Sequence, residues 1–226
     1  ELAVAYKGRG VLAFDLAGQE KDYPAKAHRE AFQLILKHNI NSTVHGGEAF
    51  GSASIAQALH YCGAHRIGHG TRLKEDPDLL RYVRDHRVPL EMCLSSNIQT
   101  RAVDRIKDHP CGEYFRQGLR VTLNTDNRLM SNVTLGTELQ ALVDAFGYTH
   151  HDLEWLTINA MKSAFVPFDE RVALIDEIKG DGHFSLYLSN FNGVSSSPST
   201  KPAGAAPLFD YTVTDGALIA VIGAAK

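Results

Sequence analysis

The sequence is poor in cysteine, has no concentration of basic residues and contains no long apolar run. Its three cysteines, Cys62, Cys93 and Cys111, are an odd number with no Cys-x-x-Cys spacing, which favours buried, reduced thiols. The 23 basic and 26 acidic residues are scattered along the chain, so no nucleic-acid surface is expected. No apolar stretch approaches the roughly 20 residues that span a bilayer, and no signal peptide is visible. These absences predict a cytoplasmic protein without a nucleic-acid or membrane partner, and they leave its oligomeric state open.

What is present is an ordinary globular composition, with 44% hydrophobic and 22% charged residues, in a chain long enough to bury a sizeable core. Apolar, strand-like segments alternate with helical patterns, which is typical of βαβ units and a parallel sheet. Strands are predicted at 11–17, 41–45, 66–68, 88–94 and 119–124. Helices are predicted from about 24 onward and at 52–63, 76–87, 103–117, 134–146, 151–165 and 169–178.

The predicted fold class is therefore α/β, a partial (β/α)8 barrel of the TIM type with C-terminal helices. Five strands are fewer than the eight of such a barrel, and the chain starts at Glu1 without a methionine. About three βα units are therefore expected upstream. Residues 1–180 are predicted to form the C-terminal portion of the barrel. Residues 181–226 are predicted to be an unrelated tail of unknown function that contains a Ser/Pro/Gly-rich linker.

The segment Thr-Val-His-Gly-Gly-Glu at 43–48 places His45 and Glu48 where an apolar strand runs out into a glycine turn. Strand ends are where a (β/α) barrel builds its active site. The two glycines allow a sharp turn, so both side chains can face one pocket. An imidazole is a natural zinc ligand, and a carboxylic acid beside it can transfer protons. The alternative is a satisfied histidine and a solvated glutamate in a glycine turn.

Two further segments have the same character, Arg-Ile-Gly-His-Gly at 66–70 and Leu-Asn-Thr-Asp-Asn at 123–127. Strand alternation places Asp126 on the inward, polar face at a strand end, where it can ligate a metal. His69 stands between two glycines, so its ring can approach a ligand. The alternatives are a helix-capping turn for Asp126 and a core histidine for His69. The remaining histidines on helical or loop positions are interpreted as solvated, namely His28, His38, His86, His109, His150 and His151.

Taken together with Phe-Asp-Leu-Ala-Gly at 14–18, these ordered motifs resemble those of the adenosine deaminases, especially the bacterial branch, from about Glu1 to Gly180. The resemblance implies a zinc-containing (β/α)8 barrel. It also implies conversion of adenosine and deoxyadenosine to the inosine products with release of ammonia. A small-molecule purine nucleoside is the expected partner.

The resemblance also implies roles for individual side chains. His45 and Asp126 are similar to zinc ligands of the family. Glu48 is similar to the acid that protonates purine N1, which it can do where a dry pocket raises its pKa. His69 is similar to the residue that orients and helps to deprotonate the zinc-bound water.

Two more positions are assigned to substrate contacts, and one feature of the family is missing. Gly18 is similar to the backbone group that meets purine N3, and Asn127 occupies the position that contacts N7. Asn127 stands where many relatives have aspartate, but its amide donates without needing a proton. The chain contains no His-x-His pair, although the family carries one on its first strand as two further zinc ligands.

The sequence therefore predicts zinc-dependent hydrolytic deamination of adenosine and deoxyadenosine, as in purine salvage. Catalytic zinc normally takes three or more protein ligands, so the chain as written is expected to be incomplete and inactive, with its two further histidine ligands supplied from upstream. One alternative is a related adenine or aminopurine deaminase. The other is a non-catalytic fragment or fusion product.

Overall fold

The computed structural model describes residues 1–180, and the predicted tail at 181–226 lies outside the described residues. The strands are β1 (Ala13–Leu16), β2 (Asn41–Gly46), β3 (Arg66–His69), β4 (Leu90–Met92) and β5 (Val121–Leu123). They form one sheet in the order β1–β2–β3–β4–β5, and every neighbouring pair is parallel. The predicted α/β fold class with a partial barrel is confirmed.

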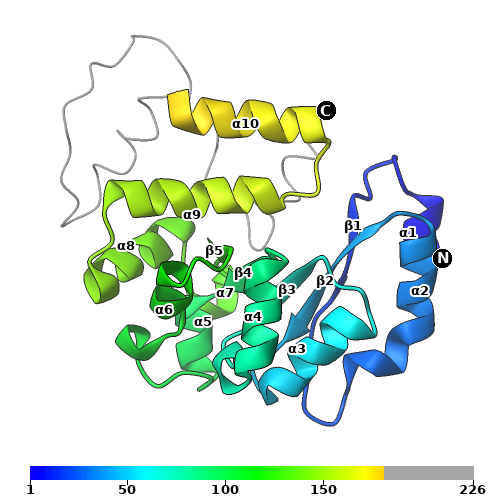
Figure 1. Ribbon diagram of the computed structural model, residues 1–226, viewed down its shortest axis with the longest axis horizontal. Helices are drawn as coiled ribbons and strands as arrows, with labels where there is room; N and C mark the ends of the chain where they lie inside the picture. The colour runs from blue at the N-terminus through cyan, green and yellow to red at the C-terminus, as the bar shows by residue number, and fades with distance from the viewer. Residues whose placement is uncertain (181–226) are drawn as a thin grey trace.

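Helical segments connect the strands and continue after them, as Figure 1 shows. Before β4 they are α1 (Leu2–Ala5), η1 (Ala25–His28), α2 (Arg29–Lys37), α3 (Gly51–His60), η2 (Leu73–Glu75) and α4 (Pro77–Asp85). After β4 they are α5 (Leu94–Gln99), η3 (Ile106–Asp108), α6 (Cys111–Arg116), α7 (Arg128–Ser131), α8 (Leu135–Phe146), α9 (His150–Ser163) and α10 (Phe168–Gly180).

Local sequence explains where several of these helices begin. The Asp76 side chain accepts hydrogen bonds from two backbone N–H groups at the start of α4, and Pro77 occupies its first turn, where a missing N–H costs nothing. Thr134 and Thr149 each form a capping box at the start of α8 and α9. A capping box satisfies two backbone donors that the helix cannot, so these starts are fixed by the chain itself.

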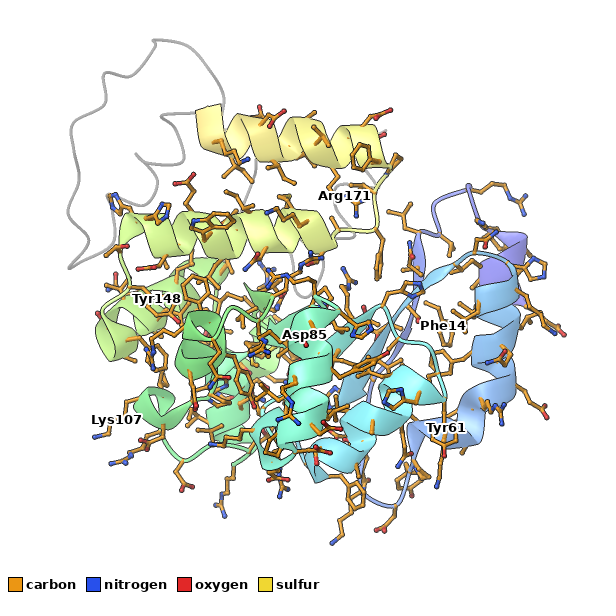
Figure 2. The ribbon with its side chains drawn as sticks, in the orientation of Figure 1. Phe14, Tyr61, Asp85, Lys107, Tyr148 and Arg171 are labelled. Atoms are coloured by element: carbon orange, nitrogen blue, oxygen red, sulfur yellow. The ribbon has the colours of Figure 1, made fainter. Side chains whose placement is uncertain are left out.

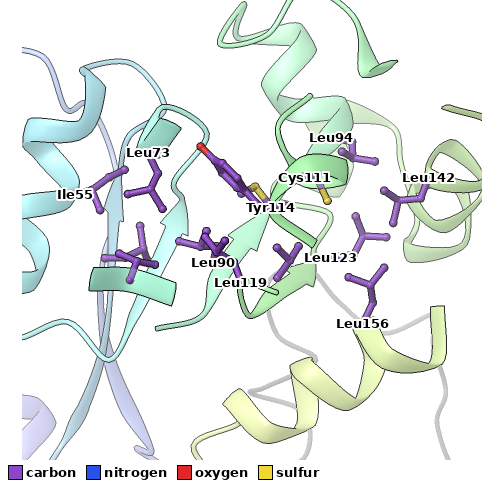
Figure 3. Packing of buried hydrophobic residues seen from close by; sticks show 14 of the residues in the cluster. Ile55, Leu73, Leu90, Leu94, Cys111, Tyr114, Leu119, Leu123, Leu142 and Leu156 are labelled. Atoms are coloured by element: carbon purple, nitrogen blue, oxygen red, sulfur yellow. The ribbon is translucent and has the colours of Figure 1, made fainter. Parts of the chain in front are cut away.

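One hydrophobic core joins the strands to the helices around them. Figure 3 shows Leu90 and Leu119 close to Tyr114, and Leu156 of α9 pointing toward Leu123. All five side chains are at most 8% exposed. Burying such side chains contributes about 1.5–3 kcal/mol each, so the sheet is anchored to α6 and α9 by this core.

The last two helices form a second, smaller layer. In Figure 1, α9 and α10 lie side by side, with α9 between α10 and the sheet. A separate cluster of buried residues, Ile158, Met161 and Ile178, joins them. At the outer surface, Figure 2 shows Lys107 and Tyr61 projecting away from the ribbon.

The sequence predicted the strands in the right places but not every helix. The predicted strand 88–94 is shorter, because the chain turns into α5 directly after Cys93. The predicted helix 103–117 is two short pieces, η3 and α6, separated by His109 and Pro110. Within residues 1–180, no helix is long and apolar enough to span a membrane.

Candidate active site

The turn after β2 depends on one glycine. Gly47 has φ +77°, and a Cβ added there would lie 2.5 Å from Cδ1 of Ile55, which is fully buried. The neighbouring Gly46 has no such constraint, since its added Cβ would meet backbone atoms of α3 at 3.4 Å. The turn brings Glu48 back toward its strand, with Oε2 3.3 Å from Nε2 of His45.

The buried carboxylate of Glu20, which the sequence analysis did not select, stabilises this turn. Glu20, which is 7% exposed, accepts hydrogen bonds from four consecutive backbone N–H groups, those of residues 47–50, at 2.8–3.2 Å. It also accepts one from Ser54 Oγ at 2.7 Å, and its Oε1 lies 3.5 Å from His45 Nε2. Hydrogen bonds to a charged acceptor are the strong ones, so Glu20 fixes the path of the chain between His45 and α3.

Glu48 is held by donors on a different element. Asn97 Nδ2 and Thr100 Oγ1, on and just after α5, donate to its Oε1 at 2.7 and 2.8 Å. Burial raises the pKa of Glu48, but the hydrogen bond with His45, the electrostatic interaction with His69 and the hydrogen bond from Thr100 outweigh it and lower the pKa to about 2. The surroundings therefore favour the carboxylate, whereas the expected acid role relied on a pocket that raises the pKa.

His69 ends β3 in a left-handed conformation, with φ +63°, which is unusual for a residue with a side chain. Its ring is 4% exposed, not open to its surroundings as its glycine neighbours suggested. Nδ1 lies 3.0 Å from Asn97 Nδ2 and 3.7 Å from Glu48 Oε1. Burial lowers the pKa of His69 more than the nearby charge of Glu48 raises it.

Asp126 follows β5 and also has a left-handed backbone, with φ +57°. Its Oδ2 accepts a hydrogen bond from Ser96 Oγ at 2.7 Å and lies 4.0 Å from Nε2 of His69. Its side chain is 40% exposed. The structure thus brings Asp126 to the same edge of the sheet as His69. Because His69 also lies close to Glu48, and Glu48 lies close to His45, the four side chains form one cluster.

Two overlapping groups of donor atoms could hold a cation. The ligand atoms of His45, Glu48 and His69 lie within 4.8 Å of one another, and so do those of His69, Cys93 and Asp126. The two expected ligands, His45 and Asp126, fall in different groups that share His69. Burial lowers the pKa of His45, but the hydrogen bond with Glu48 and the charges of Glu20, Glu48 and Asp126 together raise it. The same negative surroundings attract a metal cation, so the residues fit one.

A cavity of about 760 Å³ opens beside these groups. Gly18, His45 and Glu48 line it, and Arg72 and Asp104 are among the charged residues that line it farther along the chain. Gly18 has φ +124°, and an added Cβ would meet nothing within 4 Å, so its backbone is open toward the space. A cavity of this size is typical of small-molecule sites.

A second charged cluster, formed by Arg66, Glu91 and Asp15, lies on the sheet next to this site. Arg66 Nε lies 2.9 Å from both Thr43 Oγ1 and Glu91 Oε1, and its guanidinium stacks 3.7 Å from the ring of Phe165. Burial raises the pKa of Glu91 and of Asp15 against the lowering charge of Arg66. A smaller cavity of about 190 Å³ lies between this cluster and the residues His69, Cys93 and Asp126.

Two sequence interpretations need restating. Asn127 does not line either of the two cavities described above; it is exposed, and its Oδ1 accepts from Met130 N at the start of α7. The prediction that His109 is solvated is wrong. It is 2% exposed, because it lies between η3 and α6 against Asn97, and a loop without periodicity gives no sign of such burial.

The polar residues at 95–97 were also missed, although a signal existed. Ser96 and Asn97 follow the apolar strand around β4, just as the other candidate residues follow β2, β3 and β5. The same strand-end rule would have selected them.

Comparison with known proteins identifies the family and supports the fold. The sequence model of the family described as adenosine deaminase matches residues 1–181. The chain belongs to the adenosine deaminase family. It is 48% identical over 197 residues to "Adenosine deaminase 1" of Streptomyces coelicolor, covering 82% of this chain and 50% of that protein. It is 50% identical over 193 residues to the adenosine deaminase of Mycobacterium avium, covering 79% and 53%.

Solved structures agree on the fold of this deaminase family member. The adenine deaminase of Arthrobacter aurescens superposes with a TM-score of 0.73 at 25% identity, covering 79% of this chain and 57% of that chain. An amidohydrolase from Burkhoderia ambifaria, solved with bound Zn, gives 0.71 at 21% identity, covering 83% and 54%. The chain spans about half the length of the curated relatives that it matches.

Proposed function

We propose that this chain contributes to hydrolytic deamination of adenosine and deoxyadenosine, releasing ammonia and leaving the inosine products. The observation that carries the proposal is the convergence of Glu48, His69, His45 and Asp126 beside a nucleoside-sized cavity. Identity near one half to curated adenosine deaminases favours adenosine. An adenine deaminase is the weaker alternative, since that likeness is 25%.

The metal that fits the donor set is zinc, with His45 and Asp126 as the ligands that this chain supplies. Imidazole and carboxylate donors suit zinc. Bound zinc would supply Lewis acidity that lowers the pKa of water toward about 7. Two such ligands are fewer than catalytic zinc normally takes, and the sequence has no His-x-His pair to add. We therefore expect weak zinc binding and no turnover by the chain alone.

The remaining roles belong to the protein's own side chains. Glu48 lines the cavity; its Oε1 accepts from two donors and its Oε2 contacts only His45, so Oε2 is the atom that would pass a proton to purine N1. Protonation there relieves the charge that develops when C6 is attacked. Gly18 would offer its backbone to N3, and Asn127 would donate to N7 from Nδ2, since the cap of α7 uses only its Oδ1.

The decisive experiment compares two glutamate substitutions. The chain is combined with a segment that carries a His-x-His strand, and loss of adenosine absorbance is followed. Glu48→Gln should lower turnover by about 10²–10⁴-fold, the usual contribution of a general acid, and leave bound zinc unchanged. Glu30→Gln, on the exposed face of α2, is the matched control and should have no effect.

The outcomes separate the possible roles. Near wild-type turnover by Glu48→Gln would show that Glu48 is not the proton donor, and loss of zinc, measured by elemental analysis, would make it a ligand instead. One tightly bound zinc and clear turnover by the chain alone would contradict the ligand count. Turnover of adenine but not of adenosine would favour the alternative substrate.

A further inference from the structure

Buried polar groups next to the candidate site form a line of hydrogen bonds that leads to His69 and Glu48. It runs from the backbone N–H of Cys111 through His109 and Asn97 to His69 and Glu48. The Asn97 side chain is 0% exposed and His109 is 2% exposed. Neither belongs to the motifs that define the site, so the line is an additional feature of the fold.

The first link fixes the proton on His109. The backbone N–H of Cys111 can only donate, and it lies 3.2 Å from Nδ1 of His109, so Nδ1 carries a lone pair. Burial is the main cause that lowers the pKa of His109 to about 3, and the ring is neutral near pH 7. Its one proton is therefore on Nε2, which donates to Oδ1 of Asn97 at 3.1 Å.

The second link fixes the orientation of the Asn97 amide. With Oδ1 facing His109, the Nδ2 group donates to Glu48 Oε1 at 2.7 Å and faces His69 Nδ1 at 3.0 Å. The reversed amide would place a carbonyl oxygen 2.7 Å from a carboxylate oxygen, where neither has a proton to share. The amide therefore presents N–H groups to both Glu48 and His69.

We propose that His109 and Asn97 are positioning residues that hold His69 in the tautomer with its proton on Nε2. Nδ1 accepts from Asn97, and Nε2–H points into the gap toward Asp126, whose Oδ2 is 4.0 Å away. That distance is too long for a direct hydrogen bond and leaves room for an acceptor atom. In the proposed reaction, Nε2–H of His69 would then donate a hydrogen bond to the oxygen that attacks purine C6, and Nε2 would not take a proton from it. This last consequence rests on the proposed function; the position of the proton does not.

The proton position can be measured without any activity. Histidine labelled with ¹⁵N is incorporated into the chain, and side-chain nitrogen shifts distinguish a protonated Nε2 from a protonated Nδ1. His69 is assigned by the resonance that disappears in His69→Gln. We expect the Nε2–H form to exceed the other by about tenfold, the ratio that one hydrogen bond sustains.

A matched pair of variants tests the role of His109. Both His109→Gln and His109→Leu lose the acceptor for Cys111 N–H, but only glutamine keeps an N–H group at the place of Nε2. We expect His109→Gln to retain the Nε2–H form of His69. In His109→Leu, Oδ1 of Asn97 has no donor to hold the amide in place, so its N–H contact with His69 should weaken and the tenfold preference should fall. A purely structural role for His109 would give the same tautomer ratio in both.

Each result supports or overturns the proposal. A dominant Nδ1–H form of His69 in the wild-type chain overturns it outright, whatever the variants do. Equal tautomer ratios in the two His109 variants, both folded by circular dichroism, overturn the role of His109. Should His109→Leu not fold, Asn97→Asp replaces it, since a carboxylate offers His69 no N–H; an unchanged ratio in Asn97→Asp would then refute the relay.

Discussion

Replacing Gly47 by alanine tests whether the turn between His45 and Glu48 depends on glycine at one position. A left-handed conformation costs an alanine about 1–2 kcal/mol, and Gly47 has φ +77°. The new methyl group would also meet Ile55 Cδ1 at 2.5 Å, and overpacking of a buried neighbour costs about 1–3 kcal/mol. Alanine has less conformational freedom than glycine in the unfolded chain, and this difference stabilises the folded state by about 0.4–1 kcal/mol.

These terms predict that Gly47→Ala lowers the free energy of unfolding by about 1–5 kcal/mol. Gly46→Ala is the matched control one residue away. Its Cβ would lie 3.4 Å from backbone atoms of α3, an ordinary contact, so the same measurement should change by less than about 1 kcal/mol.

The assay is urea unfolding followed by circular dichroism, with midpoint and slope fitted for each variant. Equal losses for the two alanines would refute the argument, because only Gly47 combines a positive φ with a buried obstruction. A stable Gly47→Ala protein would mean that the turn can be rebuilt without a left-handed residue.

Three further predictions concern buried charge. Glu20→Gln should lower the free energy of unfolding by about 2–3 kcal/mol, because an amide nitrogen cannot accept from the turn's N–H groups; an unchanged urea midpoint would contradict this. The pKa of His109 falls from 6.5 to about 3 in the folded chain, so below pH 6.5 the unfolded chain takes up a proton that the folded chain refuses. Stability should then fall by about 1.4 kcal/mol per pH unit from pH 6.5 toward 3, and His109→Gln should remove that part of the slope in unfolding curves at pH 7 and 5. Arg66→Met should destabilise the chain by about 3–5 kcal/mol because it leaves Glu91 without its partner. The double variant Arg66→Met, Glu91→Gln should recover most of this loss. Thermal unfolding of the single and double variants measures both changes in stability.

The strands were predictable because their apolar runs end at glycine or polar residues. β2, β3 and β5 begin and end within a few residues of the predicted positions. The helix α5 was not predicted, since Leu94 continues an apolar run and the Ser-Ser-Asn that follows has weak helix propensity. Only the packing of Leu94 into the core decides in favour of a helix.

The candidate site was predictable to the level of residue type and strand end. Strand alternation alone did not predict the directions of the His69 and Asp126 side chains, because the backbone of both residues has a positive φ at the end of a strand. Glu20 and His109 were missed for the same physical reason. Each lies in an irregular segment, where burial depends on what packs over it and not on any spacing in its own sequence.

The sequential strand order has a consequence for how the chain folds. Each strand pairs with its neighbour in sequence, so every addition to the sheet closes a short loop at small entropic cost. The donor groups, however, are divided between β2, β3 and the residue Asp126 after β5. During synthesis, a chain that has emerged only as far as β4 can pair its strands but still lacks the carboxylate facing His69. The sheet of the described residues therefore begins to form before its donor groups are complete, and Asp126 after β5 is the last of them to be synthesised.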